Sequence, residues 1–96
     1  MTRFTVIWRR EADNELAEVW LQARDRAAVS NASGAIDRAL AEDPAEKGTP
    51  AGRGFFTLVI EPLAVLYAVN DDDRIVRVEM VRELPDASGP SAQASP

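Results

Sequence analysis

The hydrophobic residues of this chain change their spacing twice, and this change restricts the possible folds more than any other feature. Residues 3–8 alternate with a period of two, which is typical of a strand. From Ala12 to Leu40 the apolar residues recur every three or four positions, which indicates helices. From Phe55 to Leu84 the short period returns. The helices and the later strands occupy separate blocks, as expected for an α+β protein.

Two helices, each with one apolar stripe, are predicted between residues 11 and 43. The first stripe consists of Ala12, Leu16, Val19, Trp20 and Ala23. Trp8 and Trp20 are both expected in the core. Asp25 is predicted to cap the second helix, and Pro44 to end it. The stripe of that helix consists of Val29, Ala32, Ile36 and Leu40. Gly34, with small neighbours, predicts a close crossing of the two helix backbones.

The second half of the chain is predicted to form a meander of three strands. Residues 45–54 contain Gly48, Pro50 and Gly52 and are predicted to be a loop. Strands are expected at residues 55–60, 63–69 and 74–84. The predicted order is β-α-α-β-β-β, with a helical hairpin packed on one face of a mainly antiparallel four-stranded sheet. The other face is left partly open, and partners are expected either there or in the groove along the helices.

The length of 96 residues allows a single domain, predicted at residues 1–84, because so short a chain cannot divide its apolar residues between two cores. Residues 85–96 are rich in Ser, Ala, Gly and Pro and are expected to be a disordered tail. The apolar run from Phe4 to Trp8 is too short for a signal peptide or a membrane span. A cytoplasmic protein without a membrane partner is therefore expected.

The composition removes several classes of function. The absence of cysteine and histidine excludes disulfides and thiolate nucleophiles, and it removes the commonest metal ligand and general base. Asp71 to Asp73 lack the spacing of a calcium loop, so no cofactor and no metal are predicted. The net charge of −5 disfavours nucleic-acid binding, and no sequence-specific DNA binding is expected.

Several segments resemble the RelE/ParE superfamily of type II toxin-antitoxin toxins, which includes plasmid stabilisation proteins. The resemblance rests on Trp8 followed by Ala12 and Leu16, and on Ala-Ile-Asp-Arg-Ala-Leu at 35–40 with Asp43-Pro44. Above all it rests on Pro-Leu-Ala-Val-Leu-Tyr-Ala-Val at 62–69, followed by Asp-Asp-Arg at 72–74. It covers residues 4–84 and implies a toxin that a cognate antitoxin protein neutralises.

The resemblance implies one of two activities. RelE-like members cleave mRNA in the ribosome, and ParE-like members inhibit DNA gyrase. The RNase reaction needs cations around the reacting phosphate and groups that transfer protons. The basic positions that match are Arg53, Arg77 and Arg82. Lys47 is the only lysine, histidine is absent, and no tyrosine follows the last strand, so ribosome-dependent mRNA cleavage is disfavoured.

Other interpretations stay open. Tyr67 is predicted to be a core residue whose hydroxyl reaches the rim, rather than a catalytic group. A solvated sheet face, on which Arg53, Arg74, Arg77 and Arg82 pair with nearby carboxylates, is favoured over a catalytic cluster. A degenerate family member that only binds a partner is the alternative function. An enzyme with paired carboxylates is a third hypothesis, although no acidic pair has a spacing that places it beside a predicted cleft.

Overall fold

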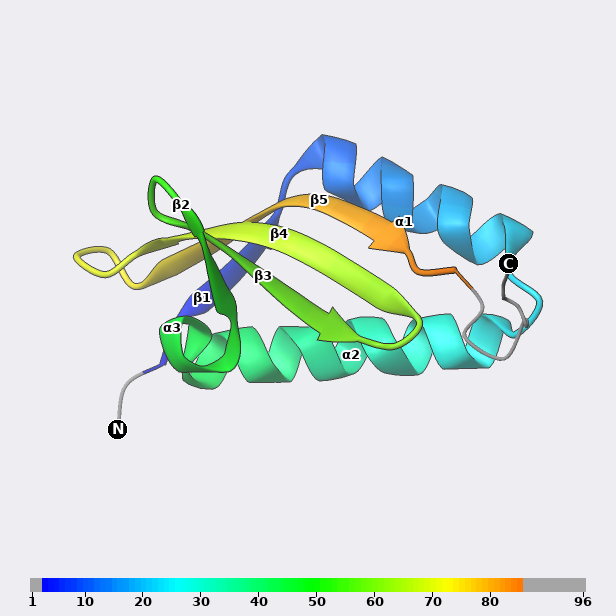
Figure 1. Cartoon of the computed structure of the whole chain (residues 1–96), viewed down its shortest axis with the longest axis horizontal. Coiled ribbons are helices and arrows are strands. Elements are labelled where there is room, and N and C mark those ends of the chain that lie inside the picture. The colour runs from blue at the N-terminus through cyan, green and yellow to red at the C-terminus, as the bar shows by residue number, and fades with distance from the viewer. Residues whose placement is uncertain (1–2, 86–96) are drawn as a thin grey trace, which may run out of the picture.

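A five-stranded sheet and two long helices make up the computed structural model, which describes residues 3–85 (Figure 1). The strands are β1 (Thr5–Trp8), β2 (Thr49–Gly52), β3 (Phe55–Ile60), β4 (Leu63–Asn70) and β5 (Ile75–Glu83). The helices are α1 (Arg10–Gln22), α2 (Arg26–Glu42) and the short α3 (Pro44–Lys47). The α+β class and the helical hairpin agree with the prediction.

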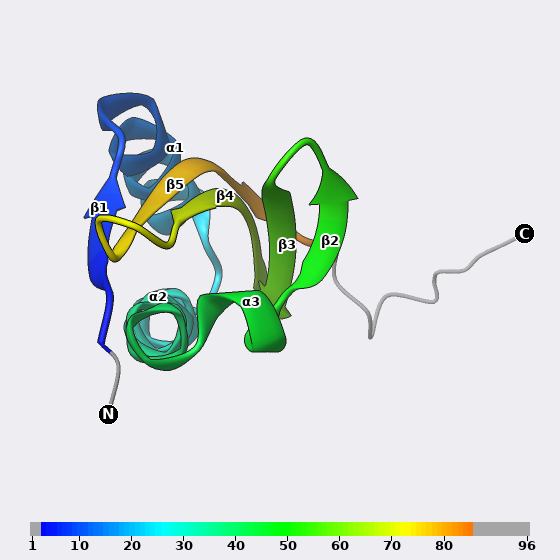
Figure 2. The same ribbon diagram turned by 90° about the vertical axis from the view of Figure 1, so that its left-hand side faces the viewer.

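The first strand of the chain lies beside the last. The strand order across the sheet is β1-β5-β4-β3-β2, with β1 parallel to β5 and every other pair antiparallel. A parallel pair needs a long crossover connection, and α1 and α2 provide part of it. In Figure 2 the sheet arches over α2, so its inner face packs on this helix.

The core lies between α2 and the inner face of the sheet. The alternation in β4 and β5 places one set of apolar residues on this face. Helix α1 adds Ala12 to this core. The other buried members of the core, from α2 and the sheet, include Val29, Ala32, Ile36, Leu40, Leu63, Val65, Tyr67, Val76 and Val78. Asp25 caps α2 as predicted, since its Oδ1 accepts a hydrogen bond of 3.0 Å from the backbone N of Ala28.

Helix α1 continues along β5 beyond the point where β1 ends. Trp8 is the last residue of β1 and pairs with Val78, so the second half of β5 has no strand on that side. Glu15 Oε1 accepts a hydrogen bond of 2.9 Å from the backbone N of Val81. The side chain of the helix thus satisfies a backbone donor that no neighbouring strand reaches.

The prediction of a loop at residues 45–54, and with it the count of four strands, is wrong. Pro44 occupies the first turn of α3, where a missing backbone N–H costs nothing. Strand β2 then pairs with β3, with Thr49 opposite Thr57. Backbone hydrogen bonds to a neighbouring strand support this edge strand although its residues include glycine and proline.

Two predictions about the helix hairpin are also wrong. A Cβ added at Gly34 would meet only Arg38 Nη1, at 3.5 Å, so the two helix backbones do not cross closely there. Trp20 is 39% exposed rather than buried. It lies at the edge of the α1 stripe, where Leu16 and Val19 already pack against the core. Trp8 does pack against the core, and its Nε1 donates a hydrogen bond of 2.7 Å to Asp37 Oδ1.

Most of the predicted tail, from residue 86 onward, lies outside the described residues, and the domain boundary at residue 84 stays a prediction. Within residues 3–85, no helix is long and apolar enough to cross a membrane.

Candidate functional site

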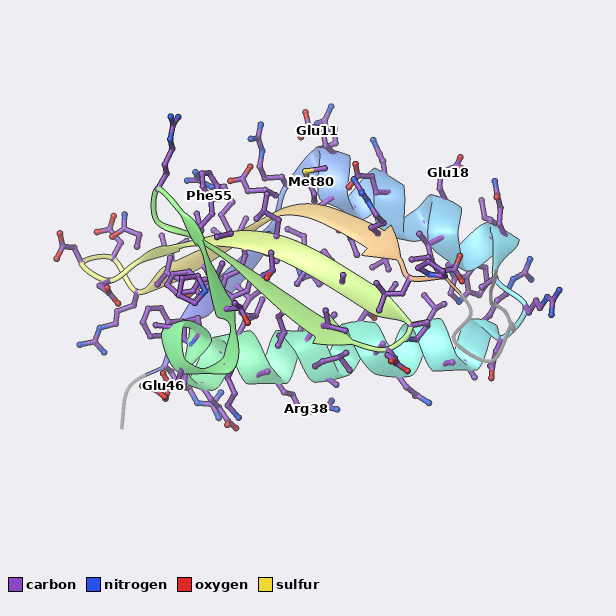
Figure 3. All side chains as sticks on the ribbon, viewed as in Figure 1. Glu11, Glu18, Arg38, Glu46, Phe55 and Met80 are labelled. Carbon is purple, nitrogen blue, oxygen red and sulfur yellow. The ribbon has the colours of Figure 1, made fainter. Side chains whose placement is uncertain are left out.

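The outer face of the sheet, opposite α2, carries the candidate site. The strand register puts Phe55, Leu66 and Met80 on this face. Phe56, Val65, Tyr67 and Val81, which adjoin them along the strands, are directed toward the core. Figure 3 shows Phe55, Met80 and Glu11 on the side of the sheet away from α2, whereas Arg38 and Glu46 project on the opposite side. The open face predicted from the sequence therefore exists between α1 and the β2–β3 hairpin.

A depression of about 410 Å³ lies on this face. Its apolar lining comes from Phe55, Leu66 and Met80. Four charged side chains complete the lining, namely Arg9, Glu11, Glu15 and Glu79. One cation therefore faces three carboxylates around an apolar surface.

The charges of the depression are largely paired with one another. Arg9 Nη1 donates to Glu79 Oε1 at 2.9 Å, and Arg9 Nε lies 3.6 Å from Glu11 Oε1. The hydrogen bond to Glu79, and then the charge of Glu11, raise the pKa of Arg9 above its ordinary value. Glu15 Oε1 accepts a hydrogen bond from the backbone N of Val81. This arrangement leaves no unpaired cation in the depression for a phosphate.

A β-bulge positions Glu79. Leu66 pairs with Met80 and Tyr67 pairs with Val78, so Glu79 is an extra residue with no partner on β4. The bulge also shifts the alternation of β5, so that Val78 and Val81 both lie in the core. Without the extra residue, strict alternation after Val78 would direct Met80 toward the core and Val81 toward the outer face.

Arg77 and Arg82 lie on the outer face, on either side of the bulge. Arg77 pairs with Ala68, which pairs with Phe55, and Arg82 pairs with Ala64. Both side chains belong to exposed residues. Among residues 3–85, neither takes part in an ion pair, because Glu79 pairs with Arg9. The predicted pairing of Arg77 and Arg82 with nearby carboxylates is therefore wrong.

Arg53 occupies the turn between β2 and β3, two residues before Phe55. Its backbone has a φ of 58°, in the left-handed region that side chains other than glycine rarely adopt. Gly52 and Gly54, on either side, also have positive φ values of 91° and 82°. The turn presents Arg53 as an exposed residue at the tip of the β2–β3 hairpin.

The expectation that no acidic pair would lie beside a cleft is wrong. Glu11 and Glu15 are four positions apart on α1 and both line the depression with Glu79. The spacing of four residues between Glu11 and Glu15 could have predicted that both lie on one side of the helix. The contribution of Glu79 follows from the parallel β1–β5 register and the bulge, which leave no local pattern. In the described part of the chain, no group of three or more Asp or Glu residues is placed to hold a metal ion.

The fold recurs in solved structures of toxin-antitoxin proteins. A chain of the RelBE2 toxin-antitoxin complex from Mycobacterium tuberculosis matches with a TM-score of 0.75 at 20% identity, over 90% of this chain and 97% of that chain. A chain of the chromosomal ParDE system from P. aeruginosa matches with a TM-score of 0.65 at 12% identity, over 86% and 98% of the two chains. The chain has the RelE/ParE fold.

A third solved structure that matches this chain is that of the isolated RelE toxin from E. coli. Its TM-score is 0.61 at 13% identity, and the match covers 88% of this chain and 87% of the toxin. No family model and no curated protein sequence matches the chain. The RelE/ParE fold thus occurs here at 12–20% identity to the structures compared.

Proposed function

We propose that this protein is the toxin of a type II toxin-antitoxin system and is neutralised by a cognate antitoxin protein. The observation that carries the proposal is the match to toxin-antitoxin structures over nearly the whole of both chains. The open outer face supports it, since a toxin needs a surface for a target or an inhibitor. We also propose that the protein is cytoplasmic and serves in plasmid stabilisation.

Within this function, inhibition of a protein target such as gyrase is favoured over mRNA cleavage. Three carboxylates line the depression on the outer face, and its one arginine is paired with two of them. Phosphate groups bind where cations are in excess. None of Arg53, Arg77 and Arg82 lines the depression, and these three remain the cationic candidates that a test of RNase activity has to address.

Controlled expression in a bacterial host tests the proposal. We expect growth arrest when the protein is induced alone. The test variant combines Arg53→Gly, Arg77→Ala and Arg82→Ala, and its folding is checked by circular dichroism. Arg74→Gly serves as the control, because Arg74 also has a positive φ, of 57°, but lies in the β4–β5 turn.

The outcomes separate the possible targets. If the folded triple variant loses the arrest while Arg74→Gly keeps it, the arginines are implicated and an mRNA cleavage assay follows. If the triple variant still arrests growth, a gyrase supercoiling assay is the next step.

A non-toxic relative that retains only partner binding is the second candidate. The carboxylate-lined depression favours it, since that lining lacks the free cations of a nuclease. Soluble, folded protein that leaves growth unchanged in several hosts would support this candidate against the toxin.

A further inference from the structure

The β-bulge places a methionine on the outer face of the sheet. Met80 follows Glu79, the extra residue of β5, and pairs with Leu66. Under regular alternation after Val78, Met80 would lie in the core. A β-bulge often redirects a side chain beside a functional site. The bulge therefore exposes a sulfur atom that the strand pattern would bury.

Met80 is accessible to solvent within the depression on the outer face. The residue is 40% exposed, and it lines the depression together with Phe55 and Leu66. Figure 3 shows its side chain on the side of the sheet away from α2. A small oxidant dissolved in water can therefore reach the thioether while the protein stays folded.

No other sulfur of the described residues competes for an oxidant. The chain has no cysteine, and its second methionine is Met1, which lies outside the described residues. Thiolates and thioethers are the groups of a protein that peroxides convert into sulfur oxides. Within residues 3–85, Met80 is thus the one residue open to this reaction.

The reaction with hydrogen peroxide needs no further reagent. A lone pair of the Met80 sulfur attacks one peroxide oxygen, the O–O bond breaks, and hydroxide leaves. The proton of the sulfur-bound hydroxyl group then passes to the hydroxide, which gives methionine sulfoxide and water. The sulfur is oxidised by two electrons, and the peroxide is reduced by two.

The charges of the depression favour this reaction. Three carboxylates and one arginine line it, so its net charge is negative. Positive charge develops on the sulfur while the oxygen is transferred, and nearby negative charge stabilises it. The hydroxide forms toward the open side of the depression, where water solvates it.

Oxidation of Met80 changes the outer face and not the core. Met80 takes no part in the core formed by residues 3–85. It lies instead among the apolar residues of the outer face, which include Phe55, Leu66 and the exposed Ile7 and Val59. A sulfoxide is polar, whereas the thioether is apolar and flexible. The modification therefore inserts a polar group into the middle of this apolar surface.

We propose that Met80 is a reversible oxidation site, at which a hydroperoxide converts the apolar centre of the outer face into a polar surface. In one respect the inference rests on the proposed function, namely that this change weakens the action of the toxin.

Mass spectrometry after treatment with hydrogen peroxide tests the site itself. Trypsin cleaves after Arg77 and Arg82, so the peptide of residues 78–82 reports Met80 alone. The comparison is Leu21→Met, which adds a methionine at a residue that is 58% exposed and lies outside the lining of the depression. We expect Met80 to be oxidised at least as fast as the added methionine, although it is less exposed. Slower oxidation of Met80 would overturn the proposal.

The oxidised full-length protein tests reversibility and the change of the surface. We expect the midpoint of thermal unfolding to shift by less than about 4 °C, since the core is unchanged. Retention on a hydrophobic-interaction column should decrease, and methionine sulfoxide reductase with dithiothreitol should restore it. Met80→Leu, which stays apolar, should show no change of retention after peroxide. Unfolding on oxidation, a sulfoxide that the reductase does not reduce in the folded protein, or unchanged retention would each overturn the proposal.

The growth assay tests the consequence for the proposed function. Met80→Gln introduces a polar group like that of the sulfoxide, and Met80→Leu is the apolar control. We expect Met80→Gln to weaken the growth arrest and Met80→Leu to keep it. Equal arrest by the two folded variants would overturn this consequence. If the unaltered protein causes no arrest, the toxin proposal fails, and the peptide and column measurements still decide whether Met80 is an oxidation site.

Discussion

The hydroxyl of Tyr67, in the middle of β4, donates a hydrogen bond to the carbonyl oxygen of Pro44, at the start of α3. Tyr67 is fully buried, so its ring is in the core as predicted, but its hydroxyl does not reach the rim. A Cβ at Gly48 would overlap this hydroxyl and lie 2.9 Å from the carbonyl oxygen of Thr57. The contact therefore ties the short helix and the edge strand β2 to the centre of the sheet.

The buried tyrosine predicts a loss of stability at alkaline pH. Burial raises the pKa of Tyr67 to about 12, from 10.0. The unfolded chain loses this proton first, so the free energy of unfolding holds below pH 10 and falls as the pH rises toward 12. The expected loss is about 2 to 3 kcal/mol. Denaturant unfolding across this range measures it.

Tyr67→Phe is the control for that decline. It leaves the Pro44 carbonyl without its buried donor, which costs about 1 to 2 kcal/mol at neutral pH. The free energy of unfolding of this variant is expected not to fall between pH 10 and 12 in the way that the tyrosine causes. Because Tyr67 is the only tyrosine, tyrosinate absorbance reports its titration directly. A titration near pH 10 in the folded protein would contradict the prediction.

Gly34→Ala is expected to stabilise the protein. Gly34 lies inside α2, and an added Cβ meets only the end of the flexible Arg38 side chain. Alanine is favoured over glycine in a helix interior by about 1 kcal/mol. Thermal unfolding of the two proteins measures the gain. A loss of stability would instead indicate that α1 approaches this position closely.

Glu15→Ala is expected to loosen α1 from the edge of β5. The change removes the acceptor of the Val81 N–H, and a part-buried donor left unpaired costs about 1 to 3 kcal/mol. Glu18→Ala is the matched control, since Glu18 lies on the same helix and is exposed, with a bond of 3.3 Å to Gln22. Hydrogen exchange of the Val81 amide should accelerate only in Glu15→Ala. Equal exchange in both variants would argue against the contact.

Arg53→Gly separates backbone strain from function. Glycine adopts a positive φ without the penalty that other residues have, so the variant is expected to gain up to about 1 kcal/mol of unfolding free energy. Arg74→Gly is expected to gain a similar amount. If Arg53 serves the proposed function, only Arg53→Gly reduces toxicity while stability is kept. Marked destabilisation would show that the Arg53 side chain supports the fold.

The candidate site was predictable in part. The alternation of residues 76–80 predicted that Arg77 and Glu79 face away from the core, which the register confirms for Arg77 and the lining of the depression confirms for Glu79. The same alternation placed Met80 on the core side with Val76 and Val78, which is wrong, because the bulge at Glu79 moves Met80 to the outer face. The pairing of Glu79 with Arg9 was not predictable, because these residues are 70 positions apart and meet only through the parallel β1–β5 pair. The prediction that Trp20 is buried was wrong. The spacing of apolar residues shows which side of a helix faces the core, but it does not show how much of that side a neighbouring helix covers.

The sequence by itself determined where the two long helices and four of the five strands form, and the apolar stripe of each long helix, because these properties depend on residues a few positions apart. It also determined the Asp25 cap and the absence of cysteine and histidine chemistry. The tertiary structure decided which strands pair, that residues 49–52 become an edge strand, that three carboxylates share one depression, and that Trp20 remains exposed. These outcomes depend on backbone hydrogen bonds and packing between distant segments, which leave no local pattern in the chain.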